Sequence, residues 1–261
     1  MHNAEKFYAP KRSLGQNFLC DPQICQRIVA AIPAAPDAPI LEIGPGRGAL
    51  TRILHNRPGA LFVLEKDKEL VRWLRSCFPR VGVILGDGLR FCWEQTAAMP
   101  GLSLVGNLPY NVASPMIWDM VCRCRGWQSM VFMVQKEVGL RLTAPAGSRA
   151  YGALSAWVAS FATPSYLFTV PPHVFRPQPK VDSAIVCFRP HPAPAWNEQQ
   201  ELAQLLKRLF QQRRKQLGTI LKADWGDALR LWCAEHDVDR TVRPEMLNPE
   251  QLRSLSRVLS K

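Results

Sequence analysis

The stretch ILEIGPGRG, residues 40–48, decides how the rest of the chain is organised. Its apolar start predicts a buried strand at 40–43, and the glycines that follow predict a tight turn into a helix. Gly44 and Gly46 let the backbone turn sharply and approach a ligand closely. Together with Ala49 they also fit, read permissively, the fingerprint of dinucleotide-binding loops. The loop alone therefore leaves open a nicotinamide cofactor, S-adenosylmethionine, or a glycine-rich turn that binds neither.

Apolar runs and longer segments alternate on the carboxyl side of this loop. Further strands are predicted at 61–64, 81–85, 102–105 and 130–134, with helices between them at about 48–56, 67–78, 88–98 and 113–124. Continuous apolar strands that alternate with helices are typical of a parallel sheet covered on both faces, so the predicted fold class is α/β. Ligands of such sheets bind at the carboxyl ends of the strands.

The chain divides into three parts by composition. Residues 1–20 form a basic arm, and Asp21 followed by Pro22 predicts the first helix. The α/β domain extends over 21–190, with helix at 135–162 broken near 143–148 and two strands, 166–170 and 184–188, that close the sheet antiparallel. A proline-rich stretch at 189–196 marks the boundary to a helical domain, 191–261. Helices are expected there near 197–212, 215–223, 225–236 and 248–260.

Acidic residues end the second and third predicted strands. Glu65 can accept hydrogen bonds from both ribose hydroxyls of a nucleoside, and Asp87 can accept one from an adenine amino group. The alternative for each is a cap at the start of the next helix. A glycine loop, a Glu and an Asp in this order favour an adenosine-bearing ligand, and the third-strand acid is more typical of S-adenosylmethionine enzymes than of dehydrogenases.

A short polar motif, Asn107-Leu108-Pro109-Tyr110, follows the fourth predicted strand. An amide, a kinked backbone and an aromatic ring at a strand end can hold a flat ring that carries an amino group. An enzyme that acts on the exocyclic nitrogen of adenine needs such a clamp. The alternative is a tight turn in which the Tyr packs into the core.

The charge balance predicts a polyanionic partner. Lys and Arg number 33 against 21 Asp and Glu, a net charge of +12, and neutralised phosphates release counterions. The segment 205–222 holds only basic charges, Lys207, Arg208, Arg213, Arg214, Lys215 and Lys222, which favours contact with an RNA backbone over a merely solvated helix face.

The remaining composition argues against several classes of protein. The eight cysteines include no C-x-x-C pair, which argues against a zinc ribbon or a thioredoxin-like site. The N-terminus has no apolar signal region and no apolar stretch reaches the length of a membrane span. The prediction is a cytoplasmic protein without a metal and without membrane contact.

Several motifs in a fixed order resemble one known family. They are KRSLGQNFL at 11–19, LEIGPGRGALT at 41–51, Glu65, Gly86-Asp87, NLPYN at 107–111, VQKEV at 134–138, YGALS at 151–155, VFRPQPKVDSA at 174–184 and RRK at 213–215. Over nearly its whole length the chain resembles the ribosomal RNA adenine N6-dimethyltransferases, and most closely their small-subunit (16S) branch. The resemblance implies a Rossmann-like methyltransferase sheet that uses S-adenosylmethionine, with a small all-helical C-terminal domain that docks RNA.

The resemblance also implies roles for individual residues. Cofactor contacts carry over to Asn17, Leu19, Gly44, Glu65, Asp87 and Asn107. The interpretation of the glycine-rich loop as a ligand-binding turn adds Gly46. The arm becomes a lid over the cofactor and an RNA contact that includes Lys11 and Arg12. The sequence departs from the family after Lys215, where Gln216-Leu217-Gly218-Thr219 replaces the usual residues, and at Ala153, where a basic or polar residue is frequent.

The activity that the resemblance implies is N6,N6-dimethylation of two adjacent adenosines near the 3′ end of small-subunit ribosomal RNA, within a pre-30S particle and by a monomer. The alternatives are the large-subunit branch that confers macrolide resistance, and an RNA-binding assembly factor with a vestigial site. A nicotinamide dehydrogenase is the weakest alternative, because nothing in its chemistry requires the motif at 107–110.

The expected mechanism is a clamp on a flipped adenine. The side-chain oxygen of Asn107 and the carbonyl of Leu108 accept the N6 hydrogens, Pro109 fixes the loop, and Tyr110 stacks on the base with Phe175 as the second face. Extruding a base costs a few kcal/mol, and each aromatic stack returns about 1–3 kcal/mol, so that two rings offset the cost. The alternative for Phe175 is a core position beneath the proline-rich loop.

Overall fold

The computed structural model describes residues 15–191 and 196–260 and forms two compact units. One contains the chain up to Gly139 together with Ser165–Arg189, and the other contains Leu140–Pro164 with the chain from Pro190 onward. This differs from the predicted division at residue 190, because the segment 140–164 joins the C-terminal helices. The Tyr151 hydroxyl, for example, donates to the carbonyl of Leu247 at 3.0 Å.

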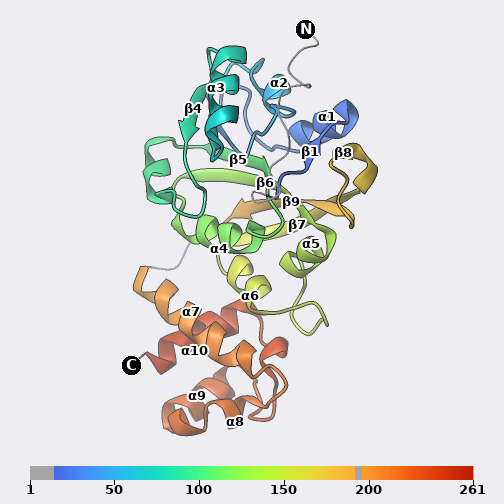
Figure 1. The fold of residues 1–261 in the computed structure, drawn as a ribbon. Coiled ribbons are helices and arrows are strands. Elements are labelled where there is room, and N and C mark those ends of the chain that lie inside the picture. The colour runs from blue at the N-terminus through green and yellow to red at the C-terminus, as the bar shows by residue number, and fades with distance from the viewer. Residues whose placement is uncertain (1–14, 192–195, 261) are drawn as a thin grey trace. The chain divides into compact units, whose positions relative to one another are not determined.

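A seven-stranded sheet organises the first unit (Figure 1). Its order is β4-β3-β2-β5-β6-β9-β7, with bounds Gly82–Leu85, Leu61–Glu65, Ile40–Ile43, Leu102–Asn107, Trp127–Gln135, Ser183–Pro190 and Ala162–Val170. The neighbours from β4 to β6 are parallel, and β9 runs antiparallel to β6. The predicted α/β class and the antiparallel closure of the sheet are confirmed.

Helices connect the parallel strands much as the sequence predicts. They are α2 (Thr51–Leu54), α3 (Lys68–Cys77) and α4 (Ala113–Arg123), while α1 (Pro22–Ala30) precedes β2 and α5 (Lys136–Leu142) follows β6. Asp21 caps α1, since its Oδ1 accepts from the backbone N–H groups of Gln23 and Ile24 at 2.8 and 3.0 Å.

The predicted helix at 88–98 is wrong. Only a short 3₁₀ helix, η2 (Trp93–Ala98), forms there. Side chains compete for the backbone groups that an α-helix would use: Asp87 accepts from the N–H of Leu89, and the Thr96 hydroxyl donates to the carbonyl of Trp93.

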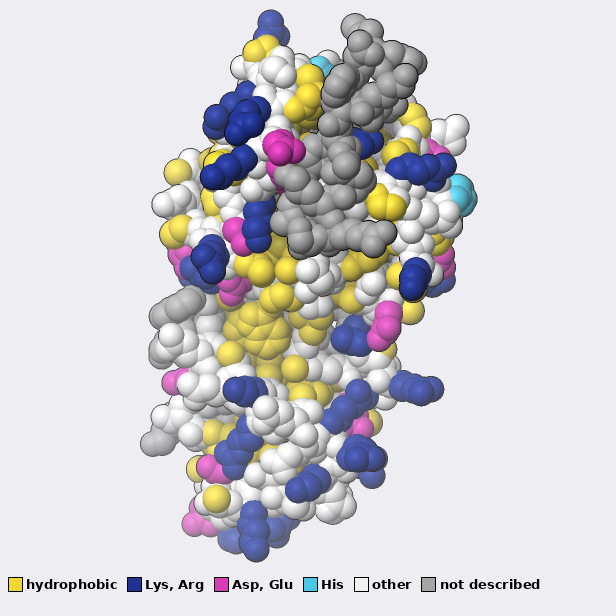
Figure 2. All heavy atoms as spheres, in the orientation of Figure 1, with side chains coloured by type: hydrophobic (Ala, Val, Ile, Leu, Met, Phe, Trp, Pro, Cys, Tyr) yellow, Lys and Arg dark blue, Asp and Glu magenta, His cyan; other side chains and the backbone are white. Residues whose placement is uncertain are grey.

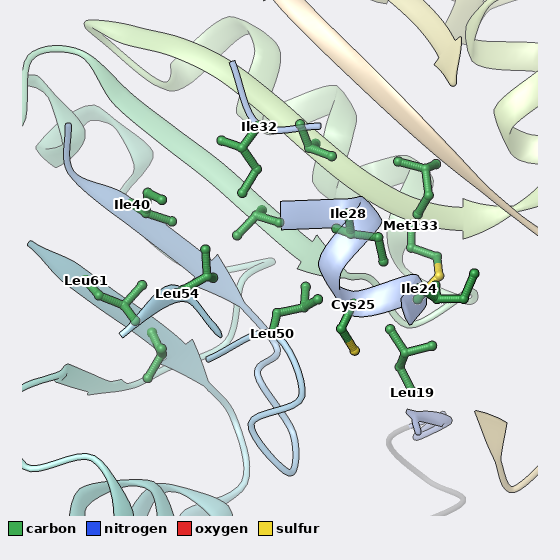
Figure 3. Close-up of a cluster of buried hydrophobic side chains, with 14 of the residues drawn as sticks. Leu19, Ile24, Cys25, Ile28, Ile32, Ile40, Leu50, Leu54, Leu61 and Met133 are labelled. Carbon is green, nitrogen blue, oxygen red and sulfur yellow. The ribbon is translucent and has the colours of Figure 1, made fainter. Parts of the chain in front are cut away.

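A hydrophobic cluster fixes α1 and α2 against the sheet (Figure 3). Ile24 and Ile28 of α1 and Leu54 of α2 pack with Ile40 and Leu61 from the strands, and all of these side chains are buried. Burying such side chains stabilises the fold by about 1.5–3 kcal/mol each. These contacts hold α1 and α2 against the amino-terminal ends of β2 and β3.

A second, two-stranded sheet joins the N-terminal segment to the proline-rich loop. β1 (Phe18–Leu19) pairs antiparallel with β8 (Phe175–Arg176), which follows the 3₁₀ helix η3 (Pro172–Val174). The backbone N–H of Cys20 extends the pairing by donating to the carbonyl of Val174 at 2.8 Å. Sequence reasoning did not predict this pairing between positions more than 150 residues apart.

The second unit is helical apart from the first residues of β7 and the last residue of β9. Its elements are α6 (Ala153–Ala159), α7 (Trp196–Gln211), α8 (Leu217–Ile220), η4 (Lys222–Asp224), α9 (Asp227–Glu235), η5 (Pro244–Met246) and α10 (Pro249–Leu259). Asn248 and Gln251 form a reciprocal capping box at the start of α10. Within residues 15–191 and 196–260, no helix is both long and apolar enough to cross a bilayer.

Candidate functional site

The carboxyl ends of four parallel strands meet at one cavity. Among its lining residues are Gly44 after β2, Glu65 at the end of β3, Asp87 after β4 and Asn107 at the end of β5. The strand order reverses between β2 and β5, which is where ligands of such sheets bind. The cavity is lined by every predicted cofactor residue (Asn17, Leu19, Gly44, Gly46, Glu65, Asp87 and Asn107) and by all of residues 107–110.

The glycine loop is shaped for close approach. Gly44 and Gly46 have φ angles of +64° and +54°, a backbone conformation that other residues rarely adopt. A Cβ at Gly46 would also lie 2.9 Å from two carbons of the Phe18 ring. The Arg47 guanidinium lies over the same ring, 4.7 Å from its centroid. The glycine therefore lets the segment that carries Asn17 and Leu19 lie against the loop.

Glu65 is a buried carboxylate at the cavity wall. Its Oε2 accepts from the N–H of Gly46 at 3.2 Å and its Oε1 from the N–H of Asp67 at 2.9 Å. Burial nevertheless raises its pKa above the usual range. A rigidly held carboxylate at this point fits the two hydroxyls of a ribose.

Asp87 is more exposed and has two polar contacts. Its Oδ1 accepts from the N–H of Leu89 at 3.0 Å, and its Oδ2 lies 2.9 Å from the Nζ of Lys66. The hydrogen bond from Lys66 is the main cause that lowers its pKa. Asp87 therefore holds the turn after β4, and it stays ionised at the edge of the cavity. A bond to an adenine amino group remains a proposal.

The side-chain amide of Asn107 is oriented by the N-terminal segment. Its Nδ2 donates to the backbone carbonyl of Asn17 at 2.8 Å. The donor side of the amide is thus engaged, and Oδ1 is the atom that can accept from a ligand. The next residue, Leu108, has a fully buried side chain, and its N–H donates to the carbonyl of Met133 at 3.1 Å. The clamp motif is therefore anchored to both β1 and β6.

Tyr110 lines the same cavity and is fixed at its far end. Its hydroxyl lies 2.6 Å from the hydroxyl of Ser183, the first residue of β9. Burial raises the pKa of Tyr110, so its ring is neutral at physiological pH. Tyr110 therefore contributes a neutral aromatic side chain to the cavity wall.

The expectation that Phe175 faces a base is wrong for this structure. The ring is fully buried in the hydrophobic cluster beside α1, and Phe175 does not line the cavity. Because Phe175 pairs with Leu19 in the small sheet, its observed role is to hold the N-terminal segment in place. This is the core alternative considered above.

The predicted RNA-binding residues fall into separate groups. Lys11 and Arg12 lie outside the described residues. Arg208 donates to the carbonyl of Ile220 and pairs with Asp224, and Arg213 donates to the carbonyl of Arg149, so both brace the helical unit. Lys207, Arg214 and Lys215 are exposed. Figure 2 shows further Lys and Arg side chains spread over this unit.

Sequence reasoning missed three residues of the site: Glu42, Phe18 and Ser183. An acid inside an otherwise apolar strand was a usable signal for Glu42, which is buried and accepts from the Thr51 hydroxyl at 2.6 Å. No local pattern could have assigned Phe18 or Ser183, because their partners are distant in the sequence. A metal-binding group of His, Cys, Asp and Glu side chains is absent from the described part of the chain.

Glu42 gives the fold a measurable pH dependence. Burial raises the pKa of its carboxyl to about 8, so between roughly pH 4.5 and 8 the folded chain keeps a proton that the unfolded chain has lost. This contribution therefore weakens as pH rises through that window. We expect Glu42→Gln to match the wild type in urea unfolding at about pH 4, below the unfolded-state pKa, and to become relatively more stable as the pH rises to 8. Parallel stability curves for the two proteins would contradict a protonated Glu42.

Comparisons with known proteins agree with this geometry. The family model described as "Ribosomal RNA adenine dimethylase" matches residues 8–261. A protein named "Ribosomal RNA small subunit methyltransferase A" from Nitratidesulfovibrio vulgaris (strain DP4) is 46% identical over 259 residues and covers 96% of each chain. Its namesake from Maridesulfovibrio salexigens is 47% identical over 247 residues and covers 94% of each.

Two solved structures share the fold at lower identity. A dimethyladenosine transferase from Plasmodium falciparum has a TM-score of 0.74 at 23% identity, covering 93% of this chain and 96% of that one. The 23S ribosomal RNA methyltransferase ErmE has a TM-score of 0.72 at 24% identity, covering 94% and 100%.

Proposed function

The chain belongs to the ribosomal RNA adenine dimethylase family, and from this premise we propose that it uses S-adenosylmethionine to dimethylate N6 of two adjacent adenosines near the 3′ end of small-subunit (16S) ribosomal RNA. The single observation that carries the proposal is the Asn107 amide. Its Nδ2 is bound to the Asn17 carbonyl, which leaves Oδ1 as the acceptor, and Asn107 lines a cavity that Glu65 lines as well. The relatives at 46–47% identity are named for the small subunit, which favours this branch over the large-subunit alternative.

The residues present fit S-adenosylmethionine. The positive φ angles of Gly44 and Gly46 bring loop backbone to the cavity wall, the fixed carboxylate of Glu65 suits a ribose, and the ionised Asp87 suits an adenine amino group. When bound, this cofactor supplies a methyl group already activated by the sulfonium. No residue then has to activate the donor, and the task of the protein is to position the acceptor.

The acceptor is a poor nucleophile, because the N6 lone pair of adenine is delocalised into the ring. Oδ1 of Asn107 and the carbonyl of Leu108 accept the N6 hydrogens and favour a pyramidal nitrogen whose lone pair points at the methyl group. Tyr110 stacks on the base and supports its extrusion from the RNA stack. The proton leaves after methylation makes the amine acidic, so a tuned general base is not required.

The proposed substrate is a pre-30S particle in the cytoplasm, and the proposed working form is a monomer. The cavity supports a monomer, since its lining includes the strand ends, the clamp and the N-terminal segment of one chain. The net charge of +12 supports a large RNA partner.

Mass spectrometry of ribosomal RNA nucleosides tests the proposal directly. Small-subunit particles from cells that lack this protein should gain dimethyladenosine when the purified protein and S-adenosylmethionine are added, and large-subunit RNA should not. An unchanged dimethyladenosine content in both RNAs would overturn the proposal, and a gain in large-subunit RNA alone would favour the other branch.

RNA docking through the exposed basic residues predicts a particular salt response. Replacing Lys207, Arg214 and Lys215 together by Ala should lower the slope of log affinity against log salt by about 2–3, because each lost phosphate contact removes roughly 0.7–0.9. The matched control replaces Lys68, Arg72 and Arg80, three exposed cations on or near α3, and should change the slope less. Equal changes in filter-binding titrations of both variants would show that only net charge matters.

A further inference from the structure

The hydroxyl pair of Tyr110 and Ser183 links the clamp motif at residues 107–110 to strand β9. The two oxygens are 2.6 Å apart, and Ser183 is fully buried. Ser183 begins β9 and is paired with Gln135, the last residue of β6. The residues beside it reinforce this position: the N–H of Lys136 donates to the carbonyl of Asp182 at 2.9 Å, and the Lys136 Nζ lies 3.1 Å from Asp182 Oδ2. The anchor of the Tyr110 hydroxyl is therefore part of the rigid sheet.

An aromatic side chain that stacks on a ligand at a cavity wall needs such an anchor more than one that is buried in the core. Tyr110 lies between β5 and α4, borders the cavity and is only partly buried, so packing restrains its ring less than it restrains a fully buried ring. A ring fixed only at its Cβ can turn about two side-chain torsions. A short hydrogen bond at the opposite end fixes the position of the hydroxyl and with it the first torsion. Because a phenolic O–H prefers to lie in the plane of its ring, the direction of this bond also favours one orientation of the plane on which a base can stack.

We propose that Ser183 is a positioning residue for methyl transfer, which holds the Tyr110 ring in the plane that the target adenine needs. The inference rests on the function proposed above and assigns a role in it to a residue outside the clamp motif. The target nitrogen is methylated twice, and the second transfer requires that a base already carrying one methyl group be held in line again. Loosening the ring should therefore affect the second transfer more than the first.

The test compares Ser183→Ala, Ser183→Thr and Tyr110→Phe on small-subunit particles. Ser183→Ala should lower the rate of methyl transfer by roughly 5- to 50-fold through lost orientation, with S-adenosylmethionine affinity within twofold of wild type. The share of N6-monomethyladenosine among the products should rise. Ser183→Thr keeps the hydroxyl and should restore both the rate and the product ratio. Tyr110→Phe should resemble Ser183→Ala, and the double variant should be no worse than the poorer single variant.

A chemically matched pair supplies the control. The hydroxyls of Tyr166 and Thr169 lie 2.7 Å apart at the surface of β7. Thr169→Ala should leave both the rate and the product ratio unchanged. Thermal unfolding and cofactor titration of each variant separate positioning from folding.

Three results would overturn the inference. Wild-type kinetics and product ratio for Ser183→Ala would remove the anchor role while leaving the proposed function intact. A parallel loss of cofactor affinity and thermal stability that Ser183→Thr does not rescue would make Ser183 a packing residue. If the wild-type protein forms no dimethyladenosine on any ribosomal RNA, the proposed function fails, and the inference fails with it.

Discussion

Asn107→Ala should abolish most methyl transfer while leaving the cofactor site usable. We expect the turnover of small-subunit RNA to fall about 100- to 1,000-fold, the loss seen when one transition-state hydrogen-bond partner is removed from a preorganised site. The reason is that the Nδ2 bond to the Asn17 carbonyl at 2.8 Å fixes the amide at the cavity wall and leaves Oδ1 as its acceptor. Single-turnover methylation with saturating S-adenosylmethionine measures this effect. A rate within a few-fold of wild type would show that the amide is not the clamp.

A second substitution separates the two contacts of this amide. Asn107→Asp retains an acceptor for the N6 hydrogens but loses the donor to the Asn17 carbonyl. If acceptance alone matters, it should recover much of the lost rate. If the bond to the N-terminal segment is what orients the oxygen, it should be nearly as slow as Asn107→Ala. Asn56→Ala, at an exposed residue whose amide donates to the carbonyl of Arg52, is the matched control and should behave as wild type.

The site was largely predictable because a parallel sheet brings the carboxyl ends of its strands to one edge. This holds regardless of the structure of the segments that connect the strands. Glu65, Asp87 and Asn107 each follow an apolar run, and the fold places all three at one cavity without any knowledge of distant contacts. The alternating pattern is local, and the resulting edge of the sheet is a consequence of topology. The glycine loop was predictable for the same reason, since its φ angles are set by its own residues.

Long-range pairing explains what the sequence did not reveal. A proline-rich loop can be recognised locally, but which side of it faces the core depends on a partner elsewhere in the chain. Phe175 is buried because it pairs with Leu19. The role of Ser183 could not be predicted because it depends on a hydrogen bond with the Tyr110 hydroxyl. The membership of residues 140–164 in the C-terminal unit depends likewise on contacts such as that of Tyr151 with Leu247.

Glu65→Gln should separate cofactor affinity from stability. The amide keeps an oxygen that can accept one backbone N–H, but it loses the charge that strengthens bonds to a ribose. Hydrogen bonds to charged groups contribute roughly 1.5–3 kcal/mol, so the dissociation constant for S-adenosylmethionine should rise about 10- to 150-fold. Calorimetric titration measures this. Glu94→Gln, at a carboxylate paired with Arg123 at 2.8 Å outside the cavity, is the control and should bind normally.

The thermal stability of Glu65→Gln should not fall in parallel with its affinity for S-adenosylmethionine. Burial raises the pKa of Glu65, so the folded chain holds its proton more tightly than the unfolded chain does, and ionisation near pH 7 weakens the fold. Removing the charge relieves this cost, but the amide leaves one of the backbone N–H groups of Gly46 and Asp67 without its acceptor, so we expect the melting temperature of the cofactor-free protein to change little. A residue retained only for the fold would show a lower melting temperature together with the weaker binding. Weaker binding at equal or greater stability is the signature of a charge that the fold tolerates because the ligand needs it.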